Sequence, residues 1–165
     1  MAASNADTAA GDERWMLEAI RLAVEGVRGG CGGPFGAVVV KNEEIVGRGC
    51  NAVTSTNDPT AHAEIVAIRA ACRELGTFSL AGCAIYASCE PCPMCLSAVY
   101  WSRVDRLYYA ATSAEAAAAG FDDEHIRREL LLPCPVRCLP AQQILRDDAL
   151  APFVEWGQTA NRVGY

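Results

Sequence analysis

The stretches TAHAE (residues 60–64) and SCEPCPMC (residues 88–95) decide how the chain is interpreted. The second stretch places Cys89, Cys92 and Cys95 three residues apart, with an acidic residue and two prolines between them. On spacing alone, these cysteines fit three ligands of one metal ion, a redox pair with a third thiol, or an unrelated cluster. The choice depends on what the first stretch adds.

Two of the cysteines and one histidine are suited to bind a metal ion together. Pro91 is tolerated in the first turn of a helix, and the spacing of Cys92 and Cys95 places both sulfurs on one face of that helix. A helix N-terminus also favours thiolate over thiol. His62 begins a second helix, for which Thr60 is a suitable N-cap. The sequence therefore predicts a zinc site with His62, Cys92 and Cys95 as ligands.

Glu64 lies two residues after His62 and is the candidate proton carrier. In a first helical turn, this spacing lets the imidazole reach the metal ion while the carboxylate reaches water beside it. Such a glutamate can take a proton from water and return it to a leaving amine. The alternatives are a closed structural zinc site, which needs Cys89 as fourth ligand, or no metal. We favour the open, catalytic site because each motif begins a helix after a strand or loop.

The order of the expected elements predicts an α/β fold. Helices are expected over residues 14–27, 62–75, 91–100 and 150–161, with helical ends over 113–130, and strands over 37–41, 45–50, 83–88, 104–111 and 135–139. A hairpin followed by strands alternating with helices indicates a three-layer α/β/α domain around a central mixed five-stranded sheet. We expect residues 1–13 to be a disordered lead and residues 14–165 to form a single domain.

Composition narrows the class of protein. The chain has 165 residues, 52% hydrophobic and 21% charged, which is typical of a globular domain. A net charge of −6 and the absence of a basic face disfavour nucleic acid as a partner. No apolar run reaches the roughly 20 residues that span a bilayer. The N-terminus shows no secretory pattern, so we expect a cytoplasmic protein without a membrane partner.

The remaining cysteines and the second histidine have simpler interpretations. Nine cysteines, an odd number, without an export signal argue against a disulfide framework. Four further cysteines are expected to pack in the core as small apolar residues: Cys31, Cys50, Cys72 and Cys83. His125 lies in a highly charged segment and is interpreted as a surface residue. The stretch CPVRC (residues 134–138) matches no catalytic pattern.

With these motifs, the chain resembles the bacterial guanine deaminases of the cytidine and deoxycytidylate deaminase superfamily. HAE at 62–64 and PCPMC at 91–95 match the His-x-Glu and Pro-Cys-x-x-Cys signature of zinc-dependent nucleobase deaminases. The likeness extends to GGPFGAVVV (32–40), NDPTAHAEIVAIRAAC (57–72), GFDD (120–123) and the terminal tyrosine. It covers the chain from about residue 14 to Tyr165, except for residues 130–141.

The resemblance implies a cytidine-deaminase-like fold and a role for each site residue. One Zn²⁺ per subunit is held by His62, Cys92 and Cys95, with Glu64 as the proton shuttle. Asp123, rather than Asp122, is the second catalytic acid. Phe35 is implied to stack on the purine base, and Asn51 to form a hydrogen bond with it. Trp101 is implied to form a second aromatic wall. The other implied substrate-binding residues are Ala63 and, from a partner subunit, Tyr165. Ordinary core packing for Phe35 and Trp101, and loop capping for Asn51, remain alternatives.

The implied reaction is hydrolysis of guanine to xanthine and ammonia. The implied assembly is a homodimer that exchanges the C-terminal segment, about residues 141–165, between subunits. Guanosine, cytosine and aminotriazines are alternative substrates. Adenosine in tRNA is a further one, although the acidic C-terminal segment offers no basic path for a backbone. A catalytically silent zinc-binding scaffold is the alternative of another class, and the presence of Glu64 argues against it.

Overall fold

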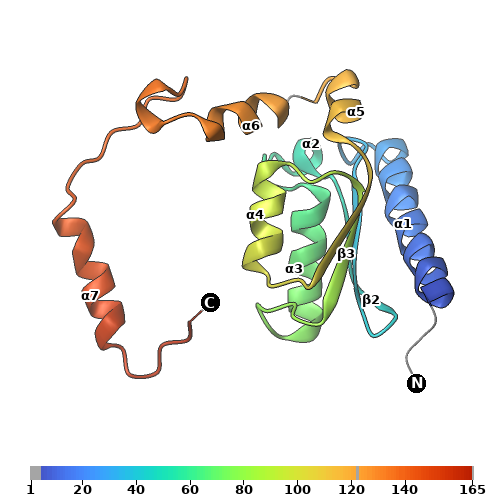
Figure 1. Cartoon of the computed structure of the whole chain (residues 1–165), viewed down its shortest axis with the longest axis horizontal. Coiled ribbons are helices and arrows are strands. Elements are labelled where there is room, and N and C mark those ends of the chain that lie inside the picture. The colour runs from blue at the N-terminus through green and yellow to red at the C-terminus, as the bar shows by residue number, and fades with distance from the viewer. Residues whose placement is uncertain (1–4, 122, 165) are drawn as a thin grey trace. The chain divides into compact units, whose positions relative to one another are not determined.

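The computed structural model describes residues 5–121 and 123–164 (Figure 1). The chain divides into two compact units, Met1–Glu124 and His125–Tyr165. Tyr165, which the resemblance assigns to substrate binding, lies outside the described residues, and so does Asp122.

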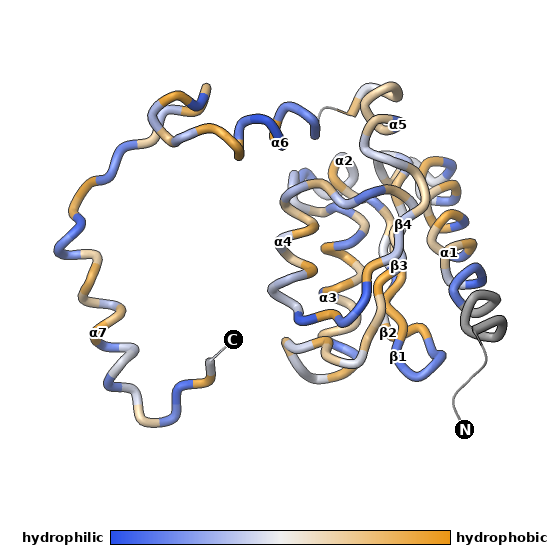
Figure 2. Tube along the Cα trace, viewed as in Figure 1, coloured by the Kyte–Doolittle hydropathy of each residue, from blue (hydrophilic) through white to orange (hydrophobic). Residues whose placement is uncertain are grey.

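A mixed sheet of four strands forms the centre of the first unit. Its strands are β1 (Gly36–Lys41), β2 (Glu44–Cys50), β3 (Cys83–Cys89) and β4 (Arg106–Ala111), in the order β2-β1-β3-β4. β1 pairs antiparallel with β2 and β3, whereas β4 runs parallel to β3. Figure 2 shows hydrophobic residues along these strands, as expected for a sheet covered on both faces.

The fifth strand predicted over residues 135–139 is wrong. The chain there forms a short 3-10 helix, η1 (Cys134–Val136), and then an irregular segment. Pro133 and Pro135 flank Cys134, and proline has no N–H to donate to a strand ladder. The β-like composition of this stretch is therefore outweighed by its prolines.

Helices cover both faces of the sheet and confirm the three-layer arrangement (Figure 1). Alternate residues of β1 point to opposite faces. Val38 and Val40 pack with Trp15 of α1 (Asn5–Arg28). Ala37 and Val39 pack instead with residues of α3 (Ala63–Leu75) and α4 (Pro93–Trp101). α1 thus lies on one face, and the two helices that carry the candidate site lie on the other.

α1 begins at Asn5 rather than at the predicted Arg14. The described part of the expected disordered lead, residues 5–13, is therefore helical. Its alanines favour a helix, since alanine has the highest intrinsic helix propensity. Asp12 is fixed to the sheet because it accepts a hydrogen bond from the Tyr86 hydroxyl.

Gly49 allows β2 to approach α3 closely. A Cβ at Gly49 would lie 2.6 Å from the backbone nitrogen of Ala67 and closer still to the carbonyl oxygen of Ala63. Any larger residue would push away the first turn of α3, which carries Glu64. This contact therefore fixes the helix start at the candidate site.

Short elements complete the two units. They are α2 (Val53–Thr56), α5 (Ser113–Ala118), α6 (Asp123–Leu131), which begins in the first unit and continues into the second, η1, η2 (Asp148–Leu150) and α7 (Ala151–Gln158). Thr112 and Glu115 form a capping box at the start of α5. No residue of α6, α7, η1 or η2 is buried. Among the described residues, none of the helices combines the length and apolar character that crossing a bilayer requires.

Candidate active site

His62 and Cys92 are the N-cap residues of the two helices that begin at the site. Both have extended backbones, with φ −69° and ψ 154° at His62 and φ −64° and ψ 166° at Cys92. Neither side chain caps its own helix. α4 begins at Pro93, two residues later than the predicted Pro91, because Pro93 occupies the first helical position. The side chains of His62 and Cys92 can therefore approach each other.

The three predicted metal ligands converge. Nδ1 of His62 lies 3.6 Å from Sγ of Cys92 and 3.5 Å from Sγ of Cys95. In a tetrahedral zinc site with Zn–S of about 2.3 Å and Zn–N of about 2.0–2.1 Å, a sulfur and a nitrogen ligand are roughly 3.5–3.6 Å apart. All three ligand atoms lie within 4.8 Å of one another. The donor set and its spacing fit a zinc ion.

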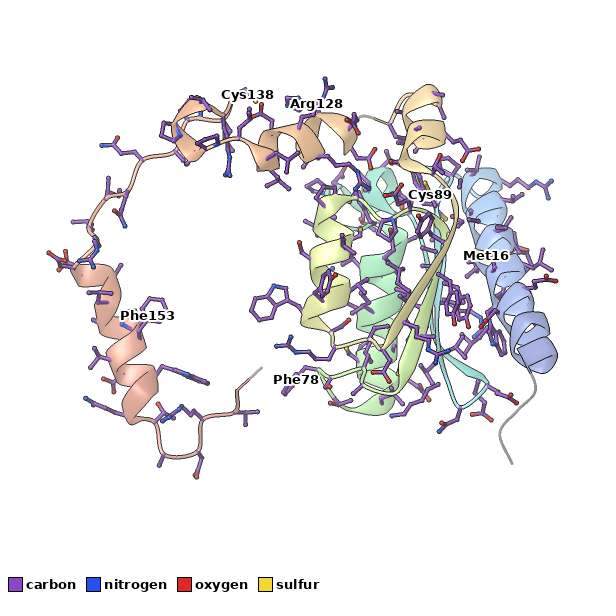
Figure 3. The ribbon with its side chains drawn as sticks, in the orientation of Figure 1. Met16, Phe78, Cys89, Arg128, Cys138 and Phe153 are labelled. Carbon is purple, nitrogen blue, oxygen red and sulfur yellow. The ribbon has the colours of Figure 1, made fainter. Side chains whose placement is uncertain are left out.

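Cys89 does not join this group. Its Sγ donates to the carbonyl oxygen of Thr112 at 3.6 Å. Figure 3 shows Cys89 at the end of β3. Glu90, which the sequence suggests as a brace for the turn that follows, accepts a hydrogen bond from Ser113 N at 3.1 Å. The closed structural site, which requires Cys89 as fourth ligand, is not formed.

Glu64 lies beside the ligands in the first turn of α3. Its side chain is 7% exposed and lines a small pocket together with His62 and Cys92. Burial raises the pKa of Glu64 above its ordinary value. A carboxyl group with a raised pKa is a better proton carrier near neutral pH than an ordinary one.

The two thiols of the site differ in acidity. A hydrogen bond from Cys95 lowers the pKa of Cys92 to about 4, against the opposing effect of burial. The same hydrogen bond and burial raise the pKa of Cys95. A hydrogen bond with Cys92 raises the pKa of His62. One thiolate is thus present at neutral pH, ready to attract a cation.

Aromatic rings, two acidic residues and Cys89 form most of the rest of the pocket wall. Phe35 and Asp123 line it together with Cys89, Glu90, Ala116 and Phe121. The rings of Phe35 and Phe121 meet edge to face, with centroids 4.7 Å apart and planes at 80°. Phe121 is not among the site residues predicted from the sequence. Its position between Gly120 and the acidic pair of GFDD was the available signal.

Asn51 holds the glycine-rich loop that carries Phe35. Its Oδ1 accepts hydrogen bonds from Gly33 N at 3.1 Å and from Val53 N at 3.2 Å, and its side chain is 5% exposed. Loop capping, one of the two predicted roles, is therefore present. The Nδ2 group remains the candidate donor to a base.

Two predicted substrate residues are not brought to the pocket. Ala63 is 1% exposed and packs in the core beneath α3. Trp101 is 60% exposed at the end of α4 and lines a separate surface hollow with Tyr100 and Arg103. In the described chain, the pocket therefore has its aromatic wall from Phe35 and Phe121 rather than from Trp101.

The family described as the cytidine and deoxycytidylate deaminase zinc-binding region matches residues 9–111, which include the three ligands and Glu64. The chain belongs to this family. Guanine deaminase from Bacillus subtilis is 50% identical over 153 residues, covering 93% of this chain and 98% of that protein. Its crystal structure superposes with a TM-score of 0.90 over the same shares of both chains.

Other members of the family match less completely. The tRNA-specific adenosine deaminase of Bacillus subtilis is 40% identical over 109 residues, 66% of this chain and 67% of that protein. A solved relative in complex with 2,6-diaminopurine is 30% identical, with a TM-score of 0.64, and covers 93% of this chain and 85% of its own.

Proposed function

We propose that this deaminase converts guanine and water to xanthine and ammonia. The observation that carries the proposal is the convergence of His62, Cys92 and Cys95 beside the buried carboxyl group of Glu64. Guanine as the substrate is supported by the relative that matches nearly the whole length of the chain, including the second unit. The net charge of −6 is also unfavourable for a tRNA substrate.

The three ligands would hold zinc through one imidazole and two thiolates. A bound zinc ion supplies a Lewis acid that lowers the pKa of water to about 7. Three protein ligands are the number that a catalytic zinc site uses, and Cys89 is not in the converging group. The Phe35 and Phe121 rings line the pocket beside these residues.

Glu64 carries the protons of the reaction. Its carboxylate takes one proton from the attacking water and passes it to a purine ring nitrogen. It then takes the second proton from the hydroxyl group now on C2 and passes it to the departing amine nitrogen. The water oxygen becomes the carbonyl oxygen on ring carbon C2, and the C2–N bond breaks to release ammonia. Burial keeps the pKa of Glu64 raised, which suits it to give the proton back.

The purine would lie against the face of Phe35, whose ring Phe121 holds from its edge. Asp123 would accept a hydrogen bond from a ring N–H, and its position in the lining of the same pocket supports this role. Asn51 would donate from Nδ2 while its Oδ1 remains bound to the loop. Tyr165 would come from a partner subunit.

The test of this function is ammonia release from a panel of free bases, nucleosides and tRNA, with the zinc-loaded full chain. We expect the highest kcat/KM with guanine. Guanosine, cytosine and aminotriazines should be poor substrates. A preference for adenosine in tRNA would show that the chain is a tRNA-specific adenosine deaminase instead. If no substrate released ammonia, the chain would be a zinc-binding scaffold.

Phe35→Leu is expected to lower kcat/KM for guanine by roughly 10-fold or more, mainly through KM. Stacking of a base on an aromatic side chain contributes about 1–3 kcal/mol, and leucine keeps the apolar bulk but not the aromatic face. Steady-state kinetics on the two proteins measure the change. Phe78→Leu is the matched control, because Phe78 is 53% exposed and lies outside the pocket. Equal KM values for all three proteins would rule out stacking on Phe35.

Substitutions of Asn51 separate its two predicted roles. Asn51→Ala removes the acceptor of two backbone N–H groups and should lower stability by about 1–3 kcal/mol, measured by denaturant unfolding. Asn51→Asp keeps the acceptor but removes the Nδ2 donor. We expect it to retain most of the stability and to lose binding of guanine. An Asn51→Asp protein with unchanged KM would leave loop capping as the whole role.

We also propose a homodimer in which residues 141–165 are exchanged. Tyr100 and Trp101 are 72% and 60% exposed on α4, and Leu131 and Phe153 are 85% and 72% exposed in the second unit. Contiguous exposed apolar surface often marks a site of protein–protein contact. Light scattering should give twice the chain mass of 17.6 kDa. A monomer would refute the exchange.

The nine free cysteines support a reducing compartment, and we propose the cytoplasm.

A further inference from the structure

Three metal-binding side chains also converge in the second unit. They are His125 and Glu129 of α6 and Cys138, and their ligand atoms all lie within 4.8 Å of one another. Nε2 of His125 is 3.6 Å from Sγ of Cys138. This separation equals that between Nδ1 of His62 and Sγ of Cys92, and it is the sulfur–nitrogen spacing of a tetrahedral zinc site, roughly 3.5–3.6 Å.

The local sequence explains how this group forms. His125 and Glu129 are four residues apart on α6, so their side chains lie on one face of the helix. After the helix, Pro133 and the η1 turn reverse the chain. Arg137 Nε donates to the carbonyl oxygen of Leu132 at 3.0 Å and holds the reversed segment against the helix end. Figure 3 labels Cys138, which follows this turn.

Glu129 fixes the cysteine at the group. Its Oε2 accepts a hydrogen bond from the backbone N–H of Cys138 at 2.7 Å, which leaves Oε1 to act as a ligand. His125 and Cys138 are exposed and Glu129 is half-buried, so an ion from solution can reach all three side chains. Imidazole, thiolate and carboxylate together favour zinc over magnesium or calcium, which prefer oxygen ligands alone.

We propose that His125, Glu129 and Cys138 bind a second zinc ion, which joins α6 to the segment that follows it. The group lies wholly within the second unit and is separate from the His62 site. The helices of this unit bury no residue, and a small unit without a core commonly depends on a metal or a covalent link. Water completes the coordination, because three protein ligands leave the fourth position to solvent.

The experiment measures bound zinc per chain. The full-length protein is stripped with a chelator, reloaded with Zn²⁺ and analysed by atomic emission after gel filtration. We expect two zinc ions per chain in the unsubstituted protein and one in Cys138→Ser and in His125→Ala. Loss of a direct ligand should weaken binding by more than the roughly 10–100-fold that loss of an outer partner costs. The remaining ion belongs to the His62 group.

Cys134→Ser is the matched control. Cys134 is exposed like Cys138 and lies four residues before it in the same turn, but it is not a member of the group. This variant should keep two zinc ions. A single ion in the unsubstituted protein would overturn the proposal, as would two ions in all variants or an equal loss in Cys134→Ser and Cys138→Ser. Equal loading by Mg²⁺ would show an unspecific acidic surface instead.

A second readout tests the role of the ion. Zinc should slow trypsin cleavage after Arg137, because a bound ion holds the segment that contains this residue. The protection should be present in Cys134→Ser and absent in Cys138→Ser. Cleavage at the same rate with and without zinc in the unsubstituted protein would refute the joining role, independently of whether guanine is deaminated.

Discussion

Glu64→Gln is expected to lower kcat by roughly 10²–10⁴-fold, the usual contribution of a positioned general acid–base group. Glutamine has nearly the shape of glutamate, but its amide cannot accept the proton of the attacking water. Glu64 is not among the three converging ligands, so bound zinc should be unchanged. Steady-state ammonia release and metal analysis on the same preparation measure both quantities.

Glu74→Gln is the control for this substitution. Glu74 lies on the same helix, α3, but it is exposed and outside the pocket. It should retain full activity. If Glu64→Gln turned over guanine at a near-native rate, Glu64 would not be the proton carrier, and another acid of the pocket would have to take that role.

Cys95→Ser is expected to remove one zinc ion per chain and to abolish measurable deamination. Cys95 is fully buried, and its sulfur lies 3.5 Å from Nδ1 of His62. Serine would replace a thiolate ligand by a hydroxyl group, which binds zinc poorly at neutral pH. Atomic emission gives the zinc content, and the rate of ammonia release gives the activity.

Cys89→Ser separates loss of a ligand from loss of a buried sulfur. Cys89 is also buried and lines the same pocket, but its thiol donates to the carbonyl oxygen of Thr112 and it is not one of the three converging residues. A serine hydroxyl can make the same hydrogen bond, so zinc content and activity should be retained. If Cys89→Ser lost zinc as completely as Cys95→Ser, the site would be closed by a fourth thiolate and would not be catalytic.

The arrangement of the ligands was predictable because each motif carries its own local signals. The helix after His62 was predicted to end at Leu75, and α3 does so, with Gly76 in the left-handed conformation at its C-cap. Proline and the cysteine spacing located the start of α4 to within two residues. Two helix starts after a strand or loop sufficed to bring the ligands together.

Features that depend on distant contacts were not predictable. The helical pattern around Trp101 gives no sign that the ring lies outside the pocket, since that depends on what packs beside α4. His125 was interpreted as a surface residue, and its proximity to Glu129 and Cys138 was not predicted. It depends on the turn after Pro133, in a stretch whose composition suggested a strand.

His62 and Cys92 are the N-caps of α3 and α4, so an ion held by both would join the starts of two helices. Helix ends normally fray independently, because their first amide groups lack partners. An ion shared between two N-caps would couple this fraying, so that neither first turn opens unless the other is released. Amide protons in both turns would then exchange with solvent together, and chelation would loosen two helices at once.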